Sequence, residues 1–521
     1  MRSSTASSRP SASASSLLLL GVLLFWACSG APRSASAPAP PEASSPAIRR
    51  GAYVVIGPTG VIALGNLHLQ RRLVPIQEGQ GLATRSLVLR ATRAELCAGL
   101  GEEAGVQIGE RTWSTGTGLL RLVDVERDAD PMGTQQLRLH FAPSQPEAPP
   151  FRVTVGYEVA ADAPWMRKWI EVENRGDLPL PVRSVQTERL PVLRPERVFG
   201  WTAEGVRSVE EAEVPAAPSG WLVLEGSFGK VFLIQEAPGF LRRVSNPTTG
   251  IVQVTTADDP ALVWLTPGER MIFPGVQWWA AAGDVEAERR AYFEFLRERS
   301  RWSRSDGGKA TIRLLALGDH PLPSIETLSE PAVALAYAWP RAWDTPGEEP
   351  RELIQAVEAL RSAGKRVYLW VPVAWIPRGG GLAEFSEWIA HTSSGEPLLA
   401  SWQGEEGLLA VIESEYRELV LNVLVALVDR LGVDGLLLGG TAVPPQGGYR
   451  YGQRLGSRLR AYLGLLELLG RLRSERPEVE LGVLPTLAPM GEGFEGMLYP
   501  FAFLAVWGET SEPAVWRTLV E

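Results

Sequence analysis

The feature that most constrains the fold of this chain is a change in hydrophobic periodicity near residue 300. Before that point, short alternating runs recur between Gly, Pro and Asn or Asp turns. These runs are residues 53–56, 87–90, 136–141, 151–159, 168–172, 230–235 and 251–255. Strands at this spacing, with no long helix among them, predict a large N-terminal β-sandwich over residues 51–282. A charged helix and a linker then connect to the next domain over residues 283–310.

In the predicted second domain, residues 311–521, apolar strand runs alternate with amphipathic helices. The strand runs are 312–317, 333–338, 366–371, 408–411, 435–438, 480–484 and 503–507. Helices are expected from Pro350 to a C′ glycine at Gly364, over 415–431 before Gly432, over 455–475, and from Pro513. This order indicates parallel βαβ units, and no Gly-rich phosphate loop follows any strand. We therefore predict a (β/α)8-type TIM barrel, and the sequence leaves open whether it is incomplete at the C-terminus.

The first fifty residues are typical of an export signal and a tether. Residues 1–28 combine early arginines with the apolar run LLLLGVLLFW and end in Phe-Trp-Ala-Cys. This end resembles a bacterial lipobox, which predicts lipidation at Cys28 and attachment to the membrane through a lipid anchor only. Ordinary cleavage near Ala27 is the alternative. Residues 29–50 are a Ser/Ala/Pro-rich tether. If Cys28 carries a lipid, Cys97 has no disulfide partner in the chain and is expected to be a small buried residue.

Composition narrows the function classes. The chain has 51 basic and 60 acidic side chains, a net charge of −9, and a nucleic-acid partner is not expected without a basic surplus. Four His and two Cys lie too far apart for a zinc motif, so neither a metal nor an organic cofactor is expected. The 18 Trp residues suit either sugar-ring faces or large β-rich cores. The sequence does not indicate an oligomeric state.

Several stretches together are similar to one enzyme family. In the first half they are 62–89, with LGN early and ATRSLVL later, and 157–174, YEVAADAPWMRKWIEVEN, with Glu188-Arg189-Leu190 after it. In the second half they are 364–372, GKRVYLWVP, then 415–417 with the helix and strand up to 438, and 506–509 with Arg517. They resemble the α-galactosidase (melibiase) group of glycoside hydrolases. The resemblance covers most of residues 60–521 and implies a sandwich followed by a (β/α)8 barrel. It also implies an enzyme that hydrolyses glycosidic bonds of galactose-type or related sugars, and the N-terminal signal predicts that this enzyme is exported.

Retaining glycosidases need two carboxylates about 5–5.5 Å apart, and a barrel places them at the carboxyl ends of its strands. The resemblance aligns the acid/base residue with Glu509; the alternative is an acid at the start of a helix. At the expected nucleophile the chain has Gly439, and Leu437 replaces the family's Lys. Asp434 matches the family's first Asp. It lies at the amino end of the strand, away from the catalytic end, and is expected to have a structural role. Glu492 is either a displaced nucleophile or a plain loop charge.

Compared with the family pattern, this chain keeps aromatic residues at the strand ends but lacks several of the expected acidic ones. A carbohydrate cleft is predicted from side chains at or near these ends: Trp339, Trp343, Asp344, Trp370, Trp375 and Trp507, with Glu492. Packing at the top of the barrel is the alternative for each tryptophan.

Three hypotheses follow from the sequence. The first is a lipid-anchored or secreted hydrolase whose nucleophile comes from Asp319, Asp344 or Glu492. The second is a catalytically inactive glycan-binding surface lipoprotein, and the third is a structural envelope lipoprotein.

Overall fold

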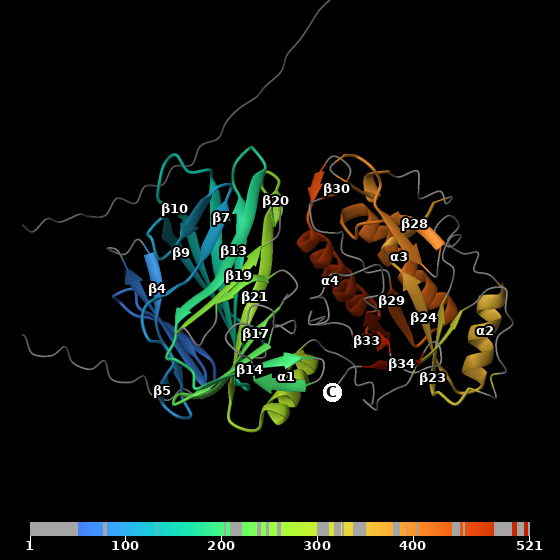
Figure 1. Cartoon of the computed structure of the whole chain (residues 1–521), viewed down its shortest axis with the longest axis horizontal. Coiled ribbons are helices and arrows are strands. Elements are labelled where there is room, and N and C mark those ends of the chain that lie inside the picture. Colours follow the sequence, from blue (N-terminus) through green and yellow to red (C-terminus); the bar gives the residue numbers. More distant parts are fainter. Residues whose placement is uncertain are drawn as a thin grey trace, which may run out of the picture. The chain divides into compact units, whose positions relative to one another are not determined.

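The structure is a computed structural model of the chain. It describes residues 51–518 except 77–80, 132, 203–204, 209–220, 237–240, 246–249, 258–261, 300–311, 317–324, 326–327, 337–350, 379–385, 393, 403–404, 440–448, 452–453, 484–502 and 508–514. Within these limits the chain is mostly β-structure with four α-helices (Figure 1).

The N-terminal part contains two antiparallel sheets. The first sheet has twelve strands: β1 (Tyr53–Ile56), β2 (Ile62–Gly65), β3 (Leu69–Ile76), β4 (Gly81–Leu89), β5 (Ala94–Glu95), β6 (Gly101–Glu102), β7 (Gly105–Ile108), β8 (Arg111–Ser114), β13 (Leu180–Pro191), β18 (Leu241–Ser245), β19 (Ile251–Ala257) and β20 (Val263–Leu265). The second has nine: β9 (Leu120–Ala129), β10 (Gln135–Pro143), β11 (Phe151–Val159), β12 (Trp165–Asn174), β14 (Arg197–Thr202), β15 (Gly205–Ser208), β16 (Trp221–Gly226), β17 (Gly229–Gln235) and β21 (Arg270–Ala281).

Alternating apolar residues of both sheets form one buried core, as expected for a sandwich. Cys97 belongs to this core, and burial raises the pKa of its thiol. The helix expected after the strands is α1 (Val285–Arg299). Its Tyr292 and Phe295 pack in a second cluster with Trp165 and Trp279 of the nine-stranded sheet. The division into separate domains at residues 282 and 311 remains a prediction.

The C-terminal part contains a closed barrel of seven strands in the described residues. In barrel order they are β22 (Ile312–Ala316), β23 (Ala332–Ala336), β24 (Arg366–Pro372), β29 (Gly435–Gly439), β32 (Glu480–Val483), β33 (Phe503–Trp507) and β34 (Val515–Thr518). The first six are parallel, whereas β34 pairs antiparallel with both β33 and β22. The eightfold repeat of a (β/α)8 barrel is therefore not shown by the described residues.

Two expected elements of the barrel are corrected by the strand pairing. The run at 408–411 is no barrel strand, because β28 (Glu405–Leu409) forms an antiparallel sheet with β25 (Trp375–Pro377) and β27 (Leu399–Trp402). The helix expected from Pro513 is wrong at 515–518, where β34 closes the barrel. A further small sheet holds β26 (Ala390–His391), β30 (Tyr449–Tyr451) and β31 (Arg454–Gly456), and a 3₁₀ turn covers Ser386–Trp388.

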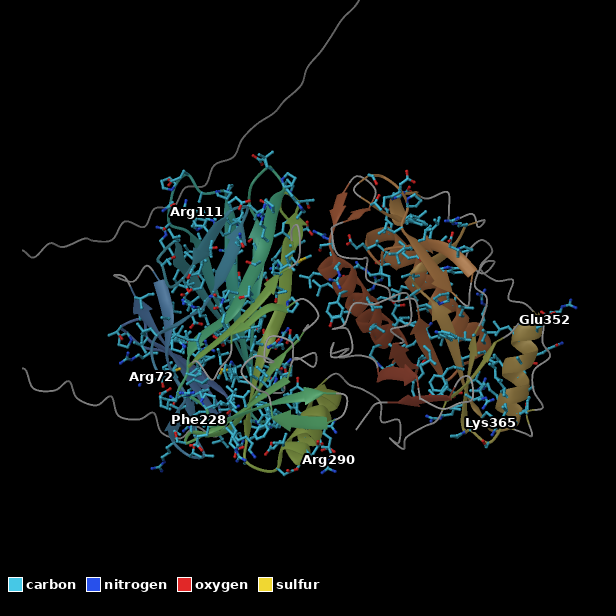
Figure 2. The ribbon with its side chains drawn as sticks, in the orientation of Figure 1. Arg72, Arg111, Phe228, Arg290, Glu352 and Lys365 are labelled. Carbon is cyan, nitrogen blue, oxygen red and sulfur yellow. The ribbon has the colours of Figure 1, made fainter. Side chains whose placement is uncertain are left out.

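The crossover helices form close to where the periodicity predicts them, except that the helix expected over 455–475 begins only at Arg458, because Arg454–Gly456 form β31. They are α2 (Arg351–Ser362), α3 (Ser414–Leu431) and α4 (Arg458–Glu475). The two expected terminal glycines are confirmed, because Gly364 and Gly432 have φ of +72° and +61°. After Gly364, the ammonium group of Lys365 donates to the carbonyls of Leu328 and Glu330 at 2.7 and 2.9 Å, which ties the start of β24 to the segment before β23. Figure 2 labels Lys365 beyond one end of α2 and Glu352 near the other.

Candidate functional site

The family resemblance expects a nucleophile at the carboxyl end of β29, but the residue at this position is Gly439. Gly439 is the last residue of this strand, and Leu437, two residues earlier on the same face, is fully buried. The Gly439 carbonyl accepts a hydrogen bond from Val373 N at 2.9 Å, just beyond the end of β24. Because glycine has no side chain, Gly439 itself can supply neither a nucleophile nor a proton donor.

The face that carries Leu437 and Gly439 combines large aromatic residues with very small neighbours. In register across the sheet, Tyr368 lies beside Gly435, and Trp370 lies between Ala336 and Leu437. A Cβ atom at Gly435 would lie 2.4 Å from the Tyr368 ring, so this close packing requires glycine. The opposite face carries Val and Leu side chains of the kind that pack beneath crossover helices.

Charged residues of the described barrel meet at the amino ends of the strands instead. Glu480 forms an ion pair with Arg366 at 3.2 Å and accepts a hydrogen bond from the Tyr368 hydroxyl. Burial, together with this contact to Glu480, raises the pKa of Tyr368. Asp434 accepts a hydrogen bond from Val367 N at 2.8 Å, the structural role expected for it. Stabilising the fold rather than performing catalysis is the usual task of this end of a barrel.

The expected cleft tryptophans differ in where they lie. Trp370 and Trp375 are 7% and 1% exposed, so both indole rings pack inside the protein in this structure. Trp375 lies just past the end of β24, as expected, and is on β25 of the small sheet. Trp507 ends β33, as expected. A role in sugar binding stays a prediction for all three.

The remaining expected site residues lie outside the described residues. They are the acid/base candidate Glu509, the cleft residues Trp339, Trp343, Asp344 and Glu492, the alternative nucleophile Asp319, and the lipidation residue Cys28. The expectations for them therefore remain predictions.

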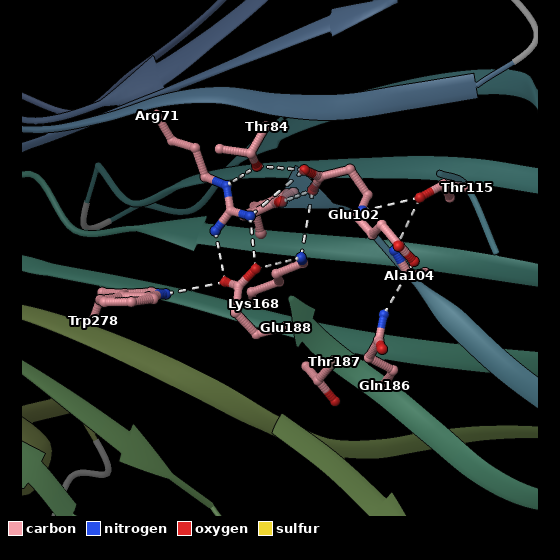
Figure 3. Close-up of polar contacts among 12 residues, drawn as sticks. Arg71, Thr84, Glu102, Ala104, Thr115, Lys168, Gln186, Thr187, Glu188 and Trp278 are labelled. Carbon is pink, nitrogen blue, oxygen red and sulfur yellow. Dashed lines mark hydrogen bonds and ion pairs between the residues drawn. The ribbon is translucent and has the colours of Figure 1, made fainter. Parts of the chain in front are cut away.

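A buried charge cluster that the sequence did not predict lies between the two sheets of the N-terminal part. Arg71, Glu103, Lys168 and Glu188 all have 0% exposure. The guanidinium of Arg71 donates to both oxygens of Glu188 at 2.7 and 2.9 Å, and Lys168 lies 3.1 Å from the same carboxylate (Figure 3). Arg71 and Lys168 each lie 3.5 Å from Glu103.

Neutral side chains complete the hydrogen bonding of this cluster. Trp278 Nε1 donates to Glu188 at 3.2 Å, and Arg71 Nε donates to the Thr84 hydroxyl at 2.7 Å. The hydroxyls of Thr84 and Tyr157 donate to Glu103. Arg71, Thr84 and Glu188 come from the twelve-stranded sheet, whereas Tyr157, Lys168 and Trp278 come from the nine-stranded one.

Electrostatics identify the cluster as part of the scaffold. Burial alone would raise the pKa of Glu188, but the charges of Arg71 and Lys168 and their hydrogen bonds lower it to about 2. The same two cations hold the pKa of Glu103 below its ordinary value, against the effect of burial. Two cations and two anions thus balance with no exposed atom for a substrate to reach. The charges within otherwise apolar strand runs were the only sequence sign of this cluster.

A second group that sequence spacing did not reveal could hold a metal ion. Strands β9 and β10 bring Asp124, Glu126 and His140 together, with their potential ligand atoms within 4.8 Å of one another. Spacing along the chain hides this arrangement because strand pairing creates it.

No helix in the described part of the chain is long and apolar enough to cross a membrane.

Comparison with known proteins supports the architecture more than the chemistry. The sequence matches no protein-family model and no curated protein. Among solved structures, the GH36 α-galactosidase AgaB from Geobacillus stearothermophilus is similar over 86% of this chain and 74% of its own, with a TM-score of 0.61 and 12% identity. The α-galactosidase from Lactobacillus brevis matches over 86% and 72%, with a TM-score of 0.59 and 11% identity.

A third similar structure is a doubly substituted form of AgaA from Geobacillus stearothermophilus, a GH36 α-galactosidase solved in complex with stachyose. The match covers 85% of this chain and 74% of the AgaA chain, with a TM-score of 0.60 and 14% identity. At such identities the likeness concerns the fold. This chain has the fold of the GH36 α-galactosidases.

Proposed function

We propose that the chain is an exported glycan-binding protein built on an α-galactosidase fold, which does not hydrolyse glycosides by that family's usual route. The observation that carries this proposal is Gly439 at the carboxyl end of β29, with buried Leu437 before it. A retaining mechanism needs a carboxylate nucleophile, and this strand end has no side chain. The fold supports a carbohydrate ligand, since a structural neighbour was solved with stachyose bound.

The sugar is proposed to bind at the carboxyl ends of the barrel strands, where enzymes of this architecture place their ligands. Trp339, Trp343 and Trp507 are the proposed aromatic contacts, with Asp344 and Glu492 as proposed polar ones. Export and anchoring through a lipid on Cys28 belong to the same proposal. The mass of the mature N-terminal peptide tests this part, since Cys28→Ser should prevent lipidation.

The second candidate function is hydrolysis of galactose-type glycosides with Glu509 as the acid/base. A glutamate can serve in this way if burial raises its pKa towards neutrality. The nucleophile would then come from Asp319, Asp344 or Glu492. The motivation for this candidate is the α-galactosidase fold itself.

One experiment separates the two candidates. The full chain is titrated with raffinose in a calorimeter and assayed for turnover of an aryl α-galactoside, alongside Glu509→Ala and the control Glu110→Gln, an exposed carboxylate of the N-terminal part. Binding without turnover supports the glycan-binding proposal. Turnover that Glu509→Ala abolishes replaces it with the hydrolase. A folded protein that neither binds nor turns over these sugars overturns both candidates.

A further inference from the structure

A histidine and two carboxylates converge on the outer side of the nine-stranded sheet. In the β9–β10 register, His140 lies opposite Asp124 and Arg138 lies opposite Glu126. Side chains two residues apart on a strand share a face, so both carboxylates lie on the same side as His140. The register shifts between His140 and Phe141, and such β-bulges change the direction of neighbouring side chains.

The imidazole of His140 is oriented as a metal ligand would be. Its Nδ1 lies 2.9 Å from the Thr154 hydroxyl, and its Nε2 lies 3.2 Å from Glu126 Oε1. Although the residue is only 6% exposed, its buried Nε2 makes no hydrogen bond of acceptable geometry with any described residue. If Nδ1–H donates to Thr154, Nε2 carries no proton and lies near two anionic carboxylates without a hydrogen bond to either, an arrangement that a bound cation would stabilise.

The two carboxylates provide access and charge. Asp124 and Glu126 are both exposed, the side chain of Glu126 by 53%, so an ion can reach the group from solvent. The ligand atoms of the three residues lie within 4.8 Å of one another, which is compatible with one shared ion. The neighbouring cation Arg138 donates to Gln136 on its own strand at 3.3 Å.

We propose that Asp124, Glu126 and His140 form a binding site for a divalent transition-metal ion, with Zn²⁺ as the preferred occupant. One imidazole nitrogen and two carboxylate oxygens are ligands that zinc accepts, and a water molecule completes a four-coordinate site. Thr154 is a positioning residue, because its hydroxyl fixes the ring through Nδ1. This site lies in the N-terminal sheet and does not depend on the proposed sugar-binding function.

The test uses Zn²⁺ itself as the probe. The full chain is freed of metal with a chelator and dialysed against zinc chloride, and bound zinc is measured by mass spectrometry of the element. We expect one equivalent to bind, and His140→Gln and Glu126→Gln each to raise the dissociation constant at least about tenfold, since even ligand-orienting residues typically contribute that much. The control Glu110→Gln removes a carboxylate of the β7–β8 turn whose side chain is 82% exposed, and should bind like the parent protein.

Thermal unfolding provides a second readout. Zinc should raise the melting temperature of the parent protein and of Glu110→Gln, because a ligand that binds only the folded state stabilises it. The same zinc concentration should raise the melting temperature of Glu126→Gln by clearly less. This variant keeps the test valid if His140→Gln fails to fold. Absence of a stoichiometric zinc ion in the parent protein, or equal binding by the parent protein and Glu126→Gln, overturns the proposal.

Discussion

Replacing Glu188 by Gln should destabilise the N-terminal sandwich by about 3–5 kcal/mol, the usual effect of removing one partner from a buried ion pair. The substitution keeps the size of the side chain but leaves Arg71 and Lys168 facing the single charge of Glu103. All four positions have 0% exposure, so solvent cannot screen the remaining positive charge. The bidentate contact to Arg71 at 2.7 and 2.9 Å is lost as a charged pair.

The pKa of Glu188 reflects the same contacts and indicates the same order of magnitude. It falls from the ordinary 4.5 to about 2 in the folded protein. At about 1.4 kcal/mol per pH unit, this corresponds to roughly 3 kcal/mol of stability. Because the folded-state pKa is the lower one, this stability is fully present above pH 4.5 and is lost as the pH falls from there towards 2. Glu188→Gln should therefore flatten the acid limb of the stability curve.

Amide hydrogen exchange of peptides from β3 and β13 measures this effect locally, which matters because a chain of this size is not expected to unfold in one step. The matched control is Glu110→Gln, whose partner Arg183 is also exposed and whose loss should cost less than about 1 kcal/mol. Adding Lys168→Met to Glu188→Gln restores the balance between Arg71 and Glu103 and should recover part of the loss. A cost below about 1 kcal/mol for Glu188→Gln, or no recovery in the double variant, would refute the reasoning.

Three further predictions concern other buried positions. Gly435→Ala should destabilise the barrel by about 1–3 kcal/mol, measured by exchange in β24 and β29, because its Cβ would lie 2.4 Å from the Tyr368 ring; an unchanged exchange rate contradicts this. Cys97 should resist iodoacetamide until the protein is unfolded, because its thiol is buried and its pKa is raised, and rapid labelling of the folded chain argues against the core position. Asn66→Ala should lower the free energy of unfolding by about 2–4 kcal/mol, because Asn66 Nδ2 donates to the Ala160 and Ala163 carbonyls at 2.9 and 2.8 Å. Thermal unfolding measures this loss, and a melting temperature lowered by less than about a degree would contradict it.

Local periodicity predicted much of the fold but not the pairing that closes the barrel. Helices α2 and α3 end at Gly364 and Gly432 because both glycines adopt a positive φ that is encoded locally. The run at 408–411 is apolar and short, and such a run does not reveal which strands it will pair with. The segment 515–518 reads as helical by sequence, yet it forms a strand because β22 and β33, which lie far apart in the sequence, both pair with it.

The candidate sites were harder to predict than the fold. The glycine at the expected nucleophile position, Gly439, is visible in the sequence because it directly follows a recognisable strand run. Neither the charge cluster nor the group of Asp124, Glu126 and His140 is visible in this way. The packing of the two sheets brings the members of the charge cluster together. The register of β9 with β10 brings His140 next to Asp124 and Glu126.

The N-terminal stretches that resemble the α-galactosidase group, residues 62–89, 157–174 and 188–190, explain why the resemblance predicts the fold better than the chemistry. Tyr157, Lys168 and Glu188 all belong to those stretches, and all three are members or partners of the buried charge cluster. Asn66 of the LGN stretch and Asn174 at the end of β12 are likewise buried and hydrogen-bonded to backbone atoms. These residues satisfy polar groups inside the sandwich and touch no solvent. A chain can therefore keep every one of them, and with them the α-galactosidase fold, while glycine stands at the strand end where the resemblance expects a nucleophile.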